Sequence, residues 1–135
     1  MTQEKELVAP CGLYCGACTM YQALTDSALA EKLSQAMGIP VDKVGCPGCR
    51  ALGGQVSMLG GATCPTYDCC VSQKGLEFCY QCDDFPCLSL APCADRANEL
   101  PHNTKVYNLV LLQRRGVDYL VKEGRDMWRR YFRGK

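Results

Sequence analysis

The sequence lacks several features on which familiar enzyme classes depend. Its 135 residues include one histidine, His102, so no Ser–His–Asp set can be argued from it. The glycine-rich stretch GGQVSMLGG at 53–61 contains no lysine, which a phosphate-binding P-loop requires. His102 follows Pro101, and we expect it to lie at a helix entry rather than to bind a metal. An enzyme is therefore unsupported by the sequence.

Long apolar runs are also missing. No run approaches the ~18 residues that a membrane-spanning helix needs. The N-terminal stretch MTQEKELVAP is charged and has no apolar h-region, so it does not look like a secretory signal. We therefore expect a cytosolic protein without a membrane partner, in which thiols stay reduced. A mature chain from which a signal had been removed would look the same.

Large apolar side chains are few, whereas cysteine is abundant. The chain has three Phe and one Trp but twelve Cys, far above normal usage. A chain with so few large apolar side chains needs covalent or metal cross-links to support its core. In a cytosolic protein, a cysteine pattern indicates metal binding or catalysis rather than a disulfide framework.

The cysteines fall into four groups, and one further cysteine follows alone. The groups are CGLYCGAC (Cys11, Cys15, Cys18), CPGC (Cys46, Cys49), CPTYDCC (Cys64, Cys69, Cys70) and CYQCDDFPC (Cys79, Cys82, Cys87), and Cys93 stands alone. Three of these groups contain a Cys-x2-Cys pair. The tight turn within such a pair lets both sulfurs reach one metal ion at about 2.3 Å. Because tetrahedral zinc takes four thiolates, we expect the pairs to combine two by two.

Zinc is the favoured metal, but the cysteine spacing is also compatible with other chemistry. An iron–sulfur cluster also uses cysteines in short runs, and Cys11, Cys15 and Cys18 with a remote fourth thiol would serve it. Disulfides and free redox-active thiols are the remaining alternatives. A thioredoxin-like pair would need a βαβ context, which the sequence does not show.

Charge is distributed unevenly along the chain. Residues 105–135 carry nine Lys or Arg and three Asp or Glu, whereas residues 1–104 carry six and eleven. The basic C-terminal residues Arg125, Arg129, Arg130 and Arg133 could in principle contact nucleic acid. Basic residues at helical spacing are usually a solvated face, however, so nucleic acid is a disfavoured partner.

The first half of the chain is predicted to hold one helix and one long loop. Residues 19–37 form a helix that packs on the core, ended by Gly38 and Pro40. Its apolar face comprises Leu24, Ala28, Leu29, Leu33 and Met37. Residues 45–75 are predicted to be loop-like, because many Gly and Pro interrupt them.

Two further helices are predicted near the C-terminus. The first spans 103–115, with Val106, Leu109, Val110 and Gln113 on one face, and Gly116 ends it. The second spans about 117–132, and Gly124 is expected to weaken it by ~1 kcal/mol relative to Ala. Its predicted apolar face comprises Leu120, Val121, Met127, Trp128, Tyr131 and Phe132.

The order of the cysteine motifs resembles domain-of-unknown-function family 3795, a group of small cysteine-rich prokaryotic proteins. CGLYCGAC, CPGC, a C-x4-C pair and KGLEFCYQCDDFPC carry this resemblance over roughly residues 8–90. The tail HNTKVYNLVLLQRRG is similar as well, though less specifically. The family implies metal binding, with zinc as the expected metal, and no established activity.

The resemblance implies ten metal ligands: Cys11, Cys15, Cys18, Cys46, Cys49, Cys64, Cys69, Cys79, Cys82 and Cys87. Cys70 and Cys93 fall outside the pattern. Ten thiols do not divide into fours. Two mononuclear sites would leave two thiols over, whereas a bridged two-zinc, six-thiolate cluster plus one four-thiolate site would use all ten.

These observations predict one domain over 1–135. A cysteine-rich, metal-binding body spans 8–93 and a helical segment spans 101–135. The expected fold class is small, metal-stabilised and mainly α, with an irregular cysteine-rich body and little β beyond short hairpins. We expect a cytoplasmic monomer with two or three zinc ions, chiefly structural, and an unknown cellular role. Its partner is unknown; another protein would suit an interaction module.

Overall fold

The chain is mainly helical, and its helices are short except near the C-terminus. The computed structural model describes residues 3–55, 61–90 and 104–133, with side chains described up to 127. Predictions for Cys93, His102, Trp128, Tyr131 and Phe132 lie outside this description. The elements are α1 (Gln3–Glu6), η1 (Cys15–Ala17), α2 (Thr19–Gln22), α3 (Ser27–Met37), η2 (Val41–Lys43), α4 (Pro65–Tyr67), η4 (Asp68–Gln73), η5 (Cys79–Gln81), η6 (Leu88–Leu90), α5 (Lys105–Arg115) and α6 (Val117–Arg133).

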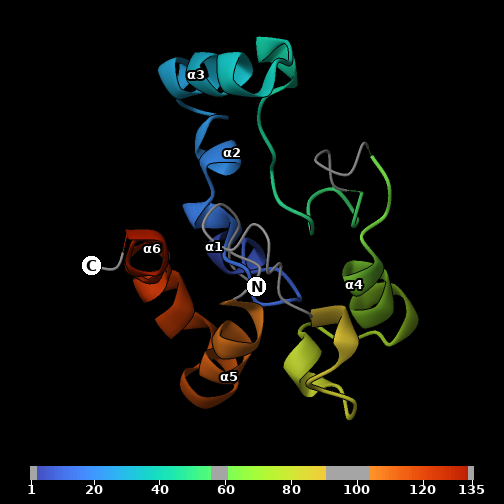
Figure 1. The fold of residues 1–135 in the computed structure, drawn as a ribbon. Helices are drawn as coiled ribbons and strands as arrows, with labels where there is room; N and C mark the ends of the chain where they lie inside the picture. The colour runs from blue at the N-terminus through green and yellow to red at the C-terminus, as the bar shows by residue number, and fades with distance from the viewer. Residues whose placement is uncertain (1–2, 56–60, 91–103, 134–135) are drawn as a thin grey trace.

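Helices α5 and α6 form a hairpin that packs against the N-terminal segment (Figure 1). The corner between them is Gly116, whose φ of 85° favours glycine. Helix α6 contacts η1 and α1, and Lys5 pairs with Asp118 at 3.1 Å. The two C-terminal helices and the glycine stop are confirmed.

A small apolar core lies where these elements meet. Val8, Leu109 and Leu120 are completely buried, and Phe78 joins them from the cysteine-rich segment. The ring of Tyr14 packs between Gly16 and Gly124, because a Cβ at either glycine would overlap it. Gly124 therefore permits close packing of α6 on η1. The low helix propensity of glycine does not by itself predict this packing.

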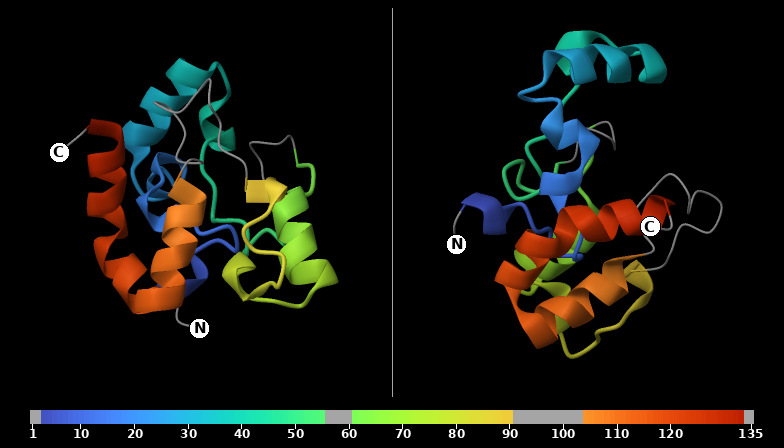
Figure 2. Two further views of the ribbon diagram at one scale, coloured as in Figure 1. Left: turned by 60° about the horizontal axis from the view of Figure 1, so that its bottom comes forward. Right: turned by 90° about the vertical axis from the view of Figure 1, so that its left-hand side faces the viewer.

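The predicted helix over 19–37 is wrong in two respects. It is divided into α2 and α3, because Asp26 adopts an extended conformation and its side chain caps α3 by accepting from Leu29 N–H at 3.1 Å. Helix α3 also projects from the body rather than packing on the core (Figure 2). Of its residues only Ala30 is buried, and Met37 is 44% exposed.

The predicted loop over 45–75 is wrong at its second half. Helix α4 begins at Pro65, which occupies the first turn, where a missing N–H costs nothing. The helix continues as the π-helical η4 to Gln73. The described residues of the first half, 45–55 and 61–64, are irregular as predicted, and Gln55 and Thr63 form an isolated antiparallel bridge. With the Val8–Tyr14 bridge, this is all the β structure found in the described residues.

No helix in the described part of the chain combines the length and apolar character needed to cross a bilayer.

Candidate metal centre

The N-terminal segment positions the first Cys-x2-Cys pair. The backbone N–H of Cys15 donates to the Leu7 carbonyl at 2.8 Å, and η1 begins at Cys15. The N–H of Cys18 then closes the turn onto the Cys15 carbonyl at 3.0 Å. Residues three apart in a 3-10 turn lie on one side. The two thiols therefore face a common direction.

The second pair lies on a loop that folds back onto the first. The N–H of Cys46 donates to the Met20 carbonyl at 3.0 Å. Gly48 is buried with φ at 99°, and a Cβ there would lie 3.9 Å from the Cys15 Sγ. The loop backbone thus passes directly over the Cys15 thiol. The CPGC and CGLYCGAC motifs, about thirty residues apart in sequence, meet here.

Three of these thiols, at Cys15, Cys18 and Cys49, have raised pKa values. Burial, aided by the nearby Cys11, raises the pKa of Cys15 to about 12. Burial also raises the pKa of Cys49 strongly, again with help from neighbouring thiols. The pKa of Cys18 is raised by burial, although the backbone N–H groups of Met20 and Tyr21 partly offset this.

Cys11 and Cys64 adjoin the same group. Burial raises the pKa of Cys11, the nearby Lys105 opposes that effect, and Cys64 adds to it. Cys64 also raises the pKa of Cys49, and its N–H donates to the Gly54 carbonyl at 2.8 Å. We call the six thiols of Cys11, Cys15, Cys18, Cys46, Cys49 and Cys64 the first cysteine cluster.

A second group gathers around Cys79. Its N–H donates to the Pro10 carbonyl at 2.9 Å, which fixes η5 against the N-terminal segment. Burial raises the pKa of Cys79, and the adjacent Cys70 thiol raises it further. Cys70 is 3% exposed, and its thiol donates to the Leu76 carbonyl at 3.7 Å. Cys69, Cys82 and Cys87 also influence these two thiols electrostatically.

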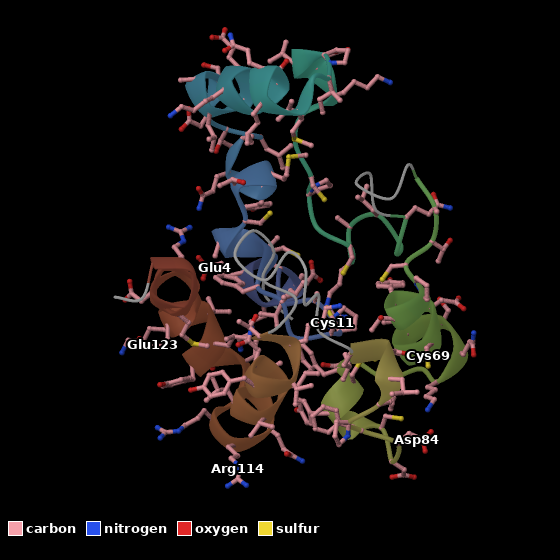
Figure 3. All side chains as sticks on the ribbon, viewed as in Figure 1. Glu4, Cys11, Cys69, Asp84, Arg114 and Glu123 are labelled. Carbon is pink, nitrogen blue, oxygen red and sulfur yellow. The ribbon has the colours of Figure 1, made fainter. Side chains whose placement is uncertain are left out.

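We call Cys69, Cys70, Cys79, Cys82 and Cys87 the second cysteine cluster. Figure 3 shows where its helix and loop lie relative to the first cluster, with Cys11 on the N-terminal loop, Cys69 on η4 and Asp84 on the loop after η5. All ten predicted ligands thus fall into one of two groups, with Cys11 also adjoining Cys79.

Cys82 differs from every other thiol described above. Lys74 Nζ donates to its Sγ at 2.8 Å, and the N–H of Asp84 donates to the same sulfur at 3.4 Å. The Asp84 carboxylate holds the ammonium group at 3.1 Å. The lysine hydrogen bond, with the Asp84 N–H second, lowers the pKa of Cys82. These contacts therefore stabilise the thiolate form of Cys82 relative to an ordinary cysteine.

The clusters are not assembled as ready coordination sites. Among the described residues, no three His, Cys, Asp or Glu side chains are arranged so that they could hold a metal ion. The donor set nevertheless suits a soft metal chemically, because it consists of paired thiols on facing loops.

Sequence reasoning missed three contributors to this region. Cys70 was set aside, yet it is the most buried thiol described and contacts Cys79. Lys74 lies eight positions from Cys82, a separation that no motif rule covers. Arg50 follows the CPGC motif and reaches the carbonyls of Val8 and Glu77. Only Lys74 could have been suspected, since it opens the motif KGLEFCYQCDDFPC.

Fold and thiols together define a small, mainly helical, cysteine-rich protein. The chain belongs to the family described as protein of unknown function (DUF3795), whose model matches residues 7–92. The matched region contains both cysteine clusters, and the resemblance seen in the motifs is confirmed. No curated protein and no solved structure gives a significant match.

Proposed function

We propose that this protein binds zinc through cysteine thiolates and that the metal is chiefly structural. The centre with the strongest support is formed by Cys15, Cys18, Cys46 and Cys49. The observation that carries it is the fold of the Cys46–Cys49 loop over Cys15, with the Gly48 backbone beside the Cys15 thiol. Two Cys-x2-Cys pairs on facing loops are the donor set of a four-thiolate zinc site.

The raised pKa values of two of these thiols support the same proposal. Burial raises the pKa of Cys15 and Cys49, since a thiolate is costly in an apolar environment, and the nearby Arg50 offsets this only in part at Cys49. A divalent cation would supply the missing charge, displace the protons and draw the sulfurs together. The free energy of metal binding would then contribute to folding.

The other six predicted ligands complete the proposed metal complement of two or three ions. Cys11 and Cys64 are the remaining members of the first cluster and would extend the four-thiolate centre toward six thiolates. Cys69, Cys79, Cys82 and Cys87 lie in the second cluster and supply four thiolates there. This grouping favours a six-thiolate arrangement plus a four-thiolate one over two separate sites with two thiols spare.

Refolding tests the proposal. The protein is unfolded with a chelator, freed of metal, and refolded with or without zinc while circular dichroism is recorded. We expect at least two zinc ions per chain to be released and native helicity to return only with zinc. The double variant Cys15→Ser/Cys49→Ser should lose at least one ion, whereas Cys93→Ser, outside the family pattern, should keep them all. Full metal-free refolding of the unmodified chain would contradict the structural role.

A further inference from the structure

Arg50 connects three parts of the chain that are distant in sequence. Its Nε donates to the Val8 carbonyl at 2.9 Å, and a terminal guanidinium nitrogen donates to the Glu77 carbonyl. The guanidinium also lies over the Phe78 ring, 5.0 Å from its centroid. Arg50 itself directly follows Cys49, the last thiol of the CPGC loop.

Each contact of Arg50 adjoins a cysteine segment. Val8 lies beside Leu7, whose carbonyl accepts from the Cys15 N–H. Glu77 and Phe78 immediately precede Cys79, and Phe78 is 2% exposed within the core. A movement of Arg50 must therefore disturb the backbone that leads into both cysteine clusters.

The chemistry of this position suits arginine specifically. A guanidinium group is planar and offers several donors in fixed directions, so that it can bind two carbonyls while stacking on an aromatic ring. Lysine has a single ammonium group on a flexible stem and cannot hold both carbonyls in this geometry. Methionine keeps the apolar stem and removes every donor.

We propose that Arg50 couples the two cysteine clusters, so that a change in the Cys46–Cys49 loop is transmitted to the segment at 77–82. This inference is conformational and stands on the contacts alone. Its consequence for metal loading rests on the proposed function: an ion bound at the first cluster would raise the affinity of the second. Coupling between binding sites typically corresponds to a ~5–150-fold change in affinity.

A double-mutant cycle tests the coupling without metal. Gly48→Ala strains the CPGC loop because Gly48 has a φ of 99°. We expect it to increase amide hydrogen exchange at 77–82 by at least ~5-fold in the wild-type background. In the Arg50→Met background, Gly48→Ala should cause no further increase in hydrogen exchange at 77–82. Gly38→Ala imposes similar strain at the end of α3, where no neighbouring atom is close, and should leave 77–82 unchanged in both backgrounds.

Equal effects of Gly48→Ala in the two backgrounds, or no effect in either, would overturn the proposal. If Arg50→Met does not fold, Arg50→Lys replaces it, since lysine keeps the charge and one hydrogen bond. The effect of Gly48→Ala at 77–82 should then be smaller than in the wild type. A purely structural role of Arg50 predicts faster exchange throughout the chain and additive effects in the cycle.

Metal loading gives the second test. One equivalent of zinc is added to metal-free protein, thiols are alkylated, and the protected cysteines are mapped by mass spectrometry. We expect the two clusters to be protected together in the wild type and the first cluster alone in Arg50→Met. Protection of one cluster only in the wild type, or of both in Arg50→Met, would contradict the coupling. If no cysteine is protected, the proposed function fails, and the metal-free cycle still decides the coupling.

Discussion

At the scale of single residues, the thiols whose pKa is shifted fall into two electrostatic classes. The half-buried thiols of Cys15 and Cys49 have raised pKa values because desolvation and neighbouring thiols disfavour the thiolate, and Arg50 offsets this only in part at Cys49. Cys82 has a lowered pKa because Lys74 donates to its sulfur. The two classes make opposite predictions when the charge environment is changed.

Replacement of Lys74 by Met is expected to raise the pKa of Cys82, since its largest stabilising contact disappears. The thiolate fraction at pH 7 falls, so iodoacetamide should modify Cys82 more slowly in the metal-free variant. The measurement is the pH dependence of alkylation of the Cys82 peptide. Lys43→Met, on η2, serves as the control and should leave the profile unchanged. An unaltered profile in Lys74→Met would refute this assignment.

The buried thiols predict how stability depends on pH. Their pKa is raised on folding, so their contribution to the free energy of unfolding is complete below the pKa of an unfolded cysteine, ~8.5. At Cys15 this contribution is lost as the pH rises toward the folded-state pKa of about 12. Each thiol that stays neutral in the folded protein should lower the free energy of unfolding by about 1.4 kcal/mol per pH unit in that window. Urea unfolding of metal-free protein at pH 7.5 and 9.5 measures this loss. Cys15→Ser should reduce the slope, and an unchanged slope would argue against a buried neutral thiol.

At the scale of elements, glycines decide how closely the helices approach. Gly124 lies in α6 beside the Tyr14 ring, and Gly16 lies beneath the same ring. The sequence suggests only that Gly124 weakens a helix, whereas the structure shows that it admits the aromatic side chain of Tyr14, the residue that precedes η1. Packing therefore outweighs local propensity at this position.

Gly124→Ala is accordingly expected to destabilise the protein. Overpacking against Tyr14 costs ~1–3 kcal/mol, which outweighs the ~1 kcal/mol gained in helix propensity. Urea unfolding compares this variant with Lys122→Ala, an exposed change in the same helix. The cost should shrink when Tyr14 is replaced by Leu. A stabilising Gly124→Ala would show that propensity, rather than the Tyr14 contact, governs this position.

The success of sequence reasoning also varied by element. The C-terminal helices were predictable because Gly116 ends one and apolar spacing marks both. The division of 19–37 was readable in principle, since Thr25-Asp26-Ser27 is rich in helix-capping residues. Pro65 was interpreted as a breaker, although it begins α4. The projection of α3 depends on tertiary contacts, which periodicity does not specify.

At the scale of the whole molecule, the cysteine-rich region and the C-terminal helices share one core. Phe78 from the second cluster's segment packs with Val8, Leu109 and Leu120. The tight turns between Cys15 and Cys18 and between Cys79 and Cys82 were predictable from the motif spacing. The assignment of motifs to clusters, and the roles of Lys74, Cys70 and Arg50, were not, because they depend on contacts between distant segments.

The central claim is that these clusters bind zinc. Elemental analysis of anaerobically purified protein for Zn, Fe and S, with a parallel assay for acid-labile sulfide, tests it most directly. We predict at least two zinc ions per chain, negligible iron and no acid-labile sulfide. Iron with stoichiometric sulfide would indicate an iron–sulfur protein instead, and less than one metal ion per chain would contradict the account.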